Sequence, residues 1–130
     1  MGERGVASNG SGAPDDLAET MALRIYSVVL ELVRRVSPVV QLLRTRSPVL
    51  ADQLERSLIS VPLNVAEGSY SRGKNRQARF QSAVASARES LACLETAQAM
   101  GYLRSIDPEV ESLFDHVIGT LVKLVEPTGE

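Results

Sequence analysis

The chain has 130 residues, enough for one domain with a single sizeable core. It contains no Trp, three Tyr and two Phe, whereas Leu, Val and Ala are abundant, and this composition favours packed helices over a β-sandwich. The lone Cys93 excludes an intrachain disulfide, and the sequence has neither a membrane-spanning apolar run of about 20 residues nor a secretory signal pattern. We therefore predict a cytoplasmic, all-α protein that does not enter a membrane.

The net charge of −2 hides an uneven distribution along the chain. Residues 1–20 and 105–130 are both acidic. Residues 21–81 carry ten basic side chains against four acidic ones, a net charge of +6. The middle of the chain can therefore offer a basic surface that the total charge conceals.

The two ends of the chain differ in composition from the rest. Residues 1–13 are rich in Gly, Ser and Asn, so they cannot bury enough apolar surface to offset their ordering entropy. We predict that they are disordered, that one helical domain spans residues 14–126, and that residues 127–130 form a tail.

The first helix is predicted to open near Pro14, where a proline suits the first turn and Asp15 complements the helix dipole. Its apolar stripe keeps its register across Pro38, so we expect one long helix, bent at that proline, that ends near Arg44–Arg46. The stripe consists of Met21, Ile25, Val28, Leu32, Val36, Val39 and Leu43.

The second helix is predicted to start at Ser47-Pro48, a cap followed by a first-turn proline, and to end at Ser69 or Tyr70. Its buried face is Leu50, Leu54, Leu58, Val61 and Val65. Because the connection to the first helix is short, the two should lie antiparallel.

Pro62 lies inside this second helix. It removes a backbone donor and crowds the carbonyl of Leu58, so we expect a kink, with the hydroxyl of Ser57 or Ser60 satisfying the freed group. Gly68 permits a left-handed residue at the exit of the helix, and Gly73 offers a second exit.

The third and fourth helices are predicted from around Lys74–Arg76 to Gly101 and from Asp107-Pro108 onward. The third repeats Phe80, Val84, Ala87, Leu91 and Leu94. The fourth has more apolar residues than one face holds, which indicates a second contact such as a neighbouring subunit. These residues are Val110, Leu113, Phe114, Val117, Ile118, Leu121, Val122, Leu124 and Val125.

One stretch places a proline, an asparagine and a glutamate inside an apolar helix. It is part of residues 53–68 and ends in Val61-Pro62-Leu63-Asn64-Val65-Ala66-Glu67-Gly68, followed by Arg72, Phe80, Ala83, Ser86 and Glu89. This pattern closely resembles the family of four-helix-bundle proteins named for an intervening sequence in 23S ribosomal RNA, which includes the accessory protein of diversity-generating retroelements. The resemblance extends over about residues 23–124.

The resemblance implies an antiparallel, up-down-up-down four-helix bundle that assembles as a ring-like homopentamer. Most members have no known biochemical activity, and the retroelement accessory proteins are implicated in binding RNA and a reverse transcriptase. This chain departs from the family at Ala85, where a glycine is usual, which could alter how closely the second and third helices approach.

The family motif matches positions whose role is structural or at an interface: Pro62, Asn64, Ala66, Glu67, Gly68, Ser86 and Glu89. Asn64 sits among buried neighbours and needs partners, and Glu67 is three residues further on the same side of the helix. One interpretation is a buried polar network that fixes helix register or a subunit interface; the other is a partner-binding patch.

A basic cluster occupies the turn between the second and third helices: Arg72, Lys74, Arg76 and Arg79. A solvated turn is the simplest interpretation. Binding of RNA or DNA is the alternative, because four positive charges lie within eight residues and Tyr70 could stack on a base.

Other chemistries find little support in the sequence. Residues 68–75 nearly match a phosphate-binding loop, but they follow a helix, and Asn75 replaces the hydroxyl residue that ligates magnesium. The only histidine, His116, has no glutamate three residues before it, as a di-iron bundle requires, and Cys93 has no evident base. We predict no catalytic residues, metal, cofactor or small-molecule substrate.

Two functions remain open. One is a non-enzymatic, self-assembling scaffold that binds RNA, DNA or a nucleic-acid enzyme such as a reverse transcriptase through its basic middle. The other is a protein–protein interaction module with no role in nucleic-acid binding.

Overall fold

The computed structural model describes residues 13–126. The predicted disordered segment, except Ala13, and the predicted tail at residues 127–130 lie outside the described residues. Within that range the chain consists of helices and their connections, which confirms the all-α prediction.

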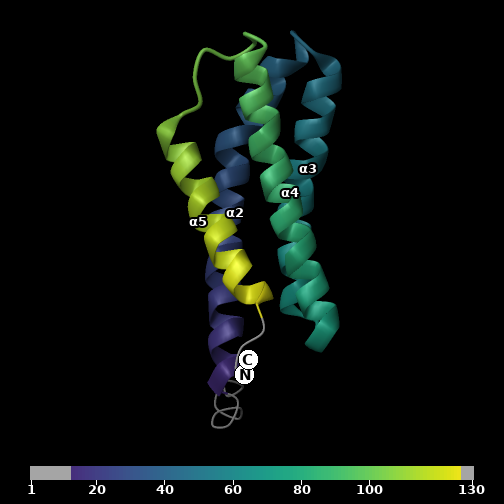
Figure 1. The fold of residues 1–130 in the computed structure, drawn as a ribbon, viewed down its shortest axis with the longest axis vertical. Helices are drawn as coiled ribbons and strands as arrows, with labels where there is room; N and C mark the ends of the chain where they lie inside the picture. The colour runs from purple at the N-terminus through teal and green to yellow at the C-terminus, as the bar shows by residue number, and fades with distance from the viewer. Residues whose placement is uncertain (1–12, 127–130) are drawn as a thin grey trace.

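Four helices run along the long axis of the molecule (Figure 1). They are α2 (Ala13–Arg44), α3 (Pro48–Ser69), α4 (Gly73–Ala99) and α5 (Pro108–Val125). The two turns that flank α3 are short, so consecutive helices reverse direction, as predicted. Within the described residues no helix has the length and hydropathy that a membrane crossing requires.

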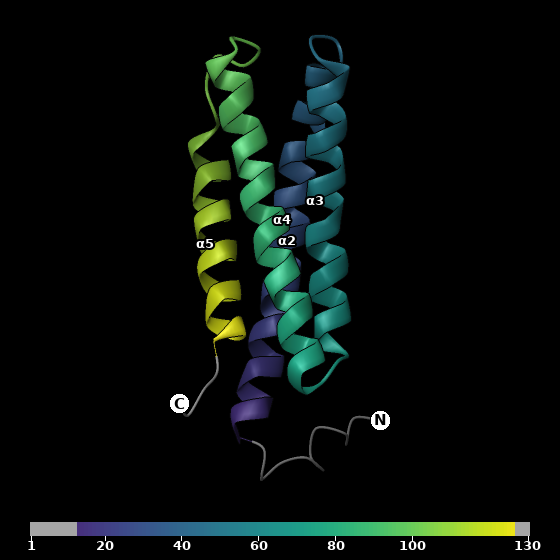
Figure 2. The same ribbon diagram turned by 45° about the vertical axis from the view of Figure 1, so that its right-hand side comes forward.

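Each helix occupies one corner of the bundle. α2 contacts α3 and α5, and α4 contacts the same two helices, while the α3–α4 contact is the most extensive. Figure 2 shows α3 and α4 together at their lower ends and further apart toward the top, whereas α5 is shorter and ends before the other helices do. The predicted up-down-up-down arrangement is thus confirmed.

Local capping signals set the helix ends. The Ser47 side chain accepts a hydrogen bond from the Leu50 amide at 3.2 Å, and the Asp107 carboxylate accepts one from the Glu109 amide at 2.9 Å. Both residues precede a first-turn proline, as predicted. Gly101 has a φ of +82° just after α4, which suits a residue without a Cβ.

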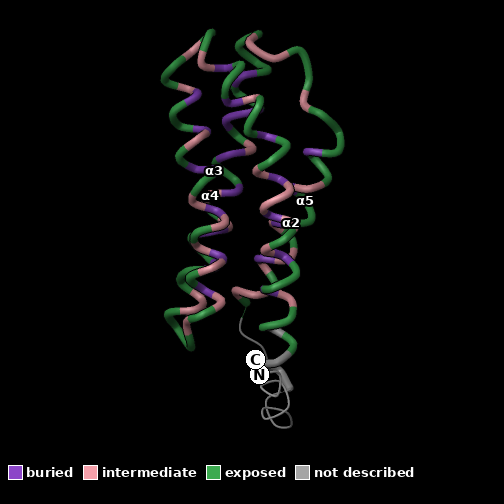
Figure 3. The backbone as a smooth tube through the Cα atoms, turned by 180° about the vertical axis from the view of Figure 1, so that it is seen from behind, coloured by how far each residue is buried: buried purple, intermediate pink, exposed green. Residues whose placement is uncertain are grey.

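The core is apolar and runs the length of the bundle (Figure 3). In α3 the predicted face is buried from Leu54 to Val65, with Ala51 replacing the half-buried Leu50. In α2 the centre of the predicted stripe is correct, but its edge shifts by one residue, because this helix packs against α3 on one side and α5 on the other. The buried residues of α2 are Ala22, Ile25, Val29, Leu32, Val36, Val40 and Leu43.

The apolar surplus of α5 is used within the bundle. Leu113, Ile118, Leu124 and Val125 are half-buried and pack against the core, and none of the large apolar side chains of α5 is among the exposed ones in the described range. The expectation that this helix offers a spare apolar face is therefore wrong. Because α5 fits between α2 and α4, it needs a wide apolar surface to contact both.

Both internal prolines lie in uninterrupted helices, Pro38 in α2 and Pro62 in α3. Ser57 donates to the carbonyl of Leu54, and the Ser60 hydroxyl accepts from Asn64. Neither serine therefore makes the predicted hydrogen bond to Leu58 within residues 13–126. The kink itself stays a prediction.

Candidate functional site

A row of hydroxyl groups joins α3 to α4. The Ser57 and Ser90 hydroxyls lie 2.8 Å apart, and both residues are buried, at 5% and 0% exposure. One turn further, the Ser86 hydroxyl donates to the Ser60 hydroxyl at 2.8 Å, and Ser90 donates back to the Ser86 carbonyl at 2.9 Å. Since every one of these hydroxyls has a partner, the polar row fixes the register of the two helices without leaving a buried group unsatisfied.

Asn64 belongs to this row, and Glu67 does not. The Asn64 amide donates to both the carbonyl and the hydroxyl of Ser60, each at 2.9 Å, and the residue is half-buried. Glu67 is exposed and lies 3.8 Å from Arg79, and no hydrogen bond joins it to Asn64 in the described structure. The predicted contact between Asn64 and Glu67 is therefore absent, and Asn64 joins a row of serines instead.

Gly68 is required for a reason that differs from the predicted one. It lies inside α3 without a positive φ, and the left-handed glycine at this exit is Gly73, the second of the two positions that the sequence offered. A Cβ placed on it would lie 2.6 Å from Cε1 of the Phe80 ring. The glycine thus lets the buried Phe80 pack directly on the backbone of α3.

Two further positions on α4, Glu89 and Ala85, have different surroundings. Glu89 accepts a hydrogen bond from the Gln53 amide at 3.3 Å across the pair. Ala85, the departure from the family pattern, is exposed and lies on the side of α4 away from the core. It therefore does not set the distance between α3 and α4.

The outer face of α3 is unusually apolar. Ile59, Leu63 and Tyr70 are 49%, 60% and 90% exposed, and Ala66 lies half-buried among them. A shallow hollow of about 480 Å³ is lined there by Leu63, Ala66, Glu67, Tyr70 and Ser71. Contiguous apolar surface of this kind marks an interaction site more often than isolated exposed residues do.

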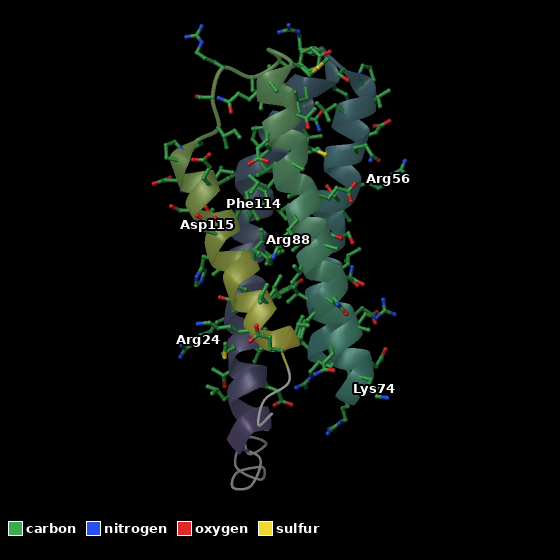
Figure 4. The ribbon with its side chains drawn as sticks, in the orientation of Figure 1. Arg24, Arg56, Lys74, Arg88, Phe114 and Asp115 are labelled. Carbon is green, nitrogen blue, oxygen red and sulfur yellow. The ribbon has the colours of Figure 1, made fainter. Side chains whose placement is uncertain are left out.

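Half of the basic cluster is engaged within the chain. The Arg76 side chain is mostly buried and donates to the Ser71 carbonyl at 3.1 Å, with Glu19 3.8 Å away. Arg79 faces Glu67 across the helix pair. Arg72 and Lys74 are exposed and form no ion pair in the described residues; Lys74 projects from the lower end of the molecule in Figure 4.

The turn that carries this cluster is a plain helix–turn–helix connection. The Ser71 hydroxyl donates to the Glu67 carbonyl at the end of α3 and accepts from the Asn75 amide. Arg72 precedes α4 without a side-chain cap, and Gly73 takes a φ of +58°. This geometry lacks the strand that precedes a phosphate-binding loop.

A second hollow, of about 410 Å³, lies between α2 and α5. Arg35 bridges Glu31 and Glu109 there, and these partners raise its pKa, the hydrogen bond to Glu31 being the largest cause. His116 also lines the hollow, but the described residues contain no group of three or more potential metal ligands. The charged groups of this hollow mainly neutralise one another.

Cys93 lies buried on α4. Burial raises the pKa of the Cys93 thiol, and the nearby negative charge of Glu89 raises it further. A thiol held in its protonated form is a poor nucleophile.

Comparisons with known proteins agree with this architecture. The profile of the family described as 23S rRNA-intervening sequence protein matches residues 21–123, which is most of the chain. The chain belongs to this family. The expected resemblance is therefore confirmed, and the match includes the hydroxyl row, the outer face of α3 and the basic turn.

A solved structure shares the fold. It is a protein of unknown function from the S23 ribosomal protein family of Bacteroides thetaiotaomicron, with a TM-score of 0.69 and 18% sequence identity. The match covers 79% of this chain and 99% of that protein. No curated protein matches the chain significantly. At this identity the likeness concerns the fold alone.

Proposed function

We propose that the chain is a non-enzymatic scaffold that works as a self-assembled oligomer, a ring of about five copies. The observation that carries the proposal is the exposed apolar face of α3, formed by Ile59, Leu63, Ala66 and Tyr70. Burying such a face against another chain removes apolar area from water at about 25 cal/mol per Å². The resemblance to a family of ring-forming bundles supports the same proposal.

The side chains with catalytic potential support a non-enzymatic role. Arg35 is held by two carboxylates, and Cys93 is buried with a raised pKa. Neither arrangement leaves an activated group beside an enclosed space that could hold a substrate.

The test of self-assembly is size-exclusion chromatography with light scattering on the full chain at micromolar concentration. A monomer has a mass of 14.0 kDa. We expect a mass several times larger, about 70 kDa for five copies. A monomer across the accessible concentration range would overturn the proposal.

Nucleic-acid binding is the second candidate. It is favoured by one observation, the exposure of Arg72, Lys74 and Tyr70 at the same turn. The two basic residues form no ion pair in the described chain. A ring would repeat these groups around an axis and multiply a weak contact with RNA or DNA. A reverse transcriptase bound to the same nucleic acid is the kind of enzyme that such a scaffold would assist.

The test of this candidate uses fluorescence anisotropy of a mixed-sequence single-stranded RNA across a salt series. The logarithm of the affinity should fall with log salt by about 0.7 per phosphate neutralised. Changing Arg72 and Lys74 to Gln should reduce that slope, whereas changing Arg24 and Arg34 of α2 to Gln should not. Equal salt slopes for the wild type and the two variants would rule out nucleic-acid binding by this turn. The scaffold would then bind proteins only.

A further inference from the structure

A regular stripe of outward residues runs along the whole of α3, apolar at five positions and charged at Asp52 and Arg56. Its members recur with the alternating spacing of three and four that a coiled-coil seam requires, and all are exposed except the half-buried Ala66. The stripe is Val49, Asp52, Arg56, Ile59, Leu63, Ala66 and Tyr70. One full side of α3 is thus patterned for a helix that the chain itself does not supply.

The outer side of α4 carries the complementary pattern. Its exposed stripe has the same three-and-four spacing, but most of its residues are small. The stripe is Ala78, Ser82, Ala85, Glu89, Ala92, Thr96 and Ala99. Large side chains on α3 and small ones on α4 would allow two helices to approach closely with knobs seated in holes.

We propose that the outer face of α3 of one copy packs antiparallel on the outer face of α4 of the next copy. This pairing rests on the proposed self-assembly and names the surface that produces it. In the register that aligns the two stripes fully, Leu63 meets Ala85, Tyr70 meets Ala78, and Val49 meets Ala99 of the neighbour. Leu63, Tyr70 and Val49 therefore each face an alanine, whereas Ile59 faces Glu89.

Charges support the same register. Arg56 would stand over Ala92 of the neighbour, with Glu89 and Glu95 one turn to either side. Figure 4 shows Arg56 pointing away from the bundle, and neither Arg56 nor Glu95 has an ion-pair partner in the described chain. The contact would give Arg56 two carboxylates at a site where its own chain provides none.

The register also determines whether the assembly closes. Within one chain Ser60 lies opposite Ser86 and Ser57 opposite Ser90, so Leu63 is level with residues 83–84 of its own α4. Contact with Ala85 of the next copy shifts that copy by only about 2 Å along the axis, at 1.5 Å per residue. A register one heptad away would shift each copy by about 10 Å and build an open helix instead of a ring.

The positions of the two helices agree with closure. α3 and α4 occupy neighbouring corners of the bundle, so their outer faces point in different directions. A subunit with two complementary faces that point in different directions makes a head-to-tail ring. The single pairing of α3 with α4 of the next copy therefore repeats until the ring closes.

Disulfide cross-linking tests the pairing in the full chain, with Cys93 changed to Ala. The double variant Leu63→Cys, Ala85→Cys should form a ladder of covalent oligomers on mild oxidation, because each chain supplies both halves of the contact. An equimolar mixture of the two single variants should stop at dimers. The out-of-register variant Leu63→Cys, Ala99→Cys should remain uncross-linked.

Charge reversal provides a second, independent measurement. Arg56→Glu should raise the concentration at which half of the chains are assembled by about tenfold, because it places like charges together. Adding Glu95→Arg to the same chain should reverse most of that loss. These variants change exposed residues, so the helical circular dichroism should be unchanged.

The outcomes separate the two proposals. A wild-type chain that stays monomeric overturns the proposed function. An oligomeric wild type that fails to cross-link between positions 63 and 85 overturns only the pairing of α3 with α4. Efficient dimers from Leu63→Cys alone would show instead that two α3 helices meet.

Discussion

The α3–α4 half of the bundle and the α2–α5 half are built differently. α3 and α4 approach closely through Gly68 and small residues, and hydroxyl groups align them. α2 and α5 are held by large apolar side chains in the interior and by the exposed pair of Arg35 and Glu109 at the rim. The first half thus has a specified register, whereas the second depends mainly on the amount of apolar surface buried.

The outer surfaces of α3 and α4 differ from that of α5. α3 and α4 present stripes of mostly apolar or small residues to the exterior, while the exposed residues of α5 include Ser112, Asp115, His116 and Lys123. On α2 the exposed large apolar side chains are Leu17, Leu23 and Leu42. A helix pair that must meet other copies benefits from a fixed register, because any slip would misalign both outer stripes. The polar row inside the pair and the stripes outside it therefore serve the same assembly.

The largest effect is expected from the apolar half. Phe114 of α5 is fully buried, so Phe114→Ala should lower the free energy of unfolding by about 3–5 kcal/mol through lost burial and the cavity it leaves. Urea denaturation at a fixed chain concentration measures this change, since assembly adds to apparent stability. A loss below about 1 kcal/mol would mean that α5 can repack around the gap.

The close approach of α3 to Phe80 predicts a smaller loss. Gly68→Ala should destabilise by up to about 2 kcal/mol, because overpacking costs about 1–3 kcal/mol and helix propensity returns about 1 kcal/mol. Gly119→Ala on α5 is the matched control, since its Cβ would meet nothing within 4 Å. It should stabilise by about 1 kcal/mol. The same sign for both substitutions would contradict the contrast between the two halves.

The hydroxyl row predicts an effect of about 1 kcal/mol. Ser57→Ala should cost that much, because Ser90 loses a buried partner but keeps its hydrogen bond to the Ser86 carbonyl. The double variant with Ser90→Ala should cost less than the sum of the two single changes. Strict additivity in this cycle would show that the two hydroxyls do not interact.

The smallest effect concerns pH. Because the pKa of Cys93 is raised in the folded chain, the native state favours the protonated thiol. The stabilising contribution of this group is complete below the ordinary thiol pKa and declines as the pH rises through the folded value. The chain should therefore lose slightly more stability at alkaline pH than Cys93→Ala does. Parallel pH profiles for the two proteins would refute this.

The sequence predicted those features that depend on neighbouring residues. Caps at Ser47 and Asp107 are local signals, and the buried face of α3 follows from its own periodicity. The role of Gly68 was misassigned because the side chain that requires a glycine there, Phe80, lies on another helix. The spare face of α5 was misassigned because periodicity counts apolar positions but not the helices they must contact.

The candidate site was likewise predicted only where it depends on neighbouring residues. The basic cluster was visible in the sequence, but the pairing of Arg76 with Glu19 and of Arg79 with Glu67 depends on tertiary structure. The buried pair of Ser57 and Ser90 was missed because a serine in a helix gives no signal of its partner. Four serines that recur at helical spacing on two adjacent helices are the pattern that could have revealed it.

Two leucines with similar exposure separate the outer face of α3 from the rest of the surface. Leu63 on α3 is 60% exposed and Leu23 on α2 is 64% exposed, so a charge at either should be tolerated by the isolated bundle. Light scattering of Leu63→Glu should give a mass near the 14.0 kDa monomer with unchanged helical circular dichroism, while Leu23→Glu should keep the assembled mass of the wild type. A Leu63→Glu protein that assembles as the wild type does would contradict the claim that the outer face of α3 joins the copies.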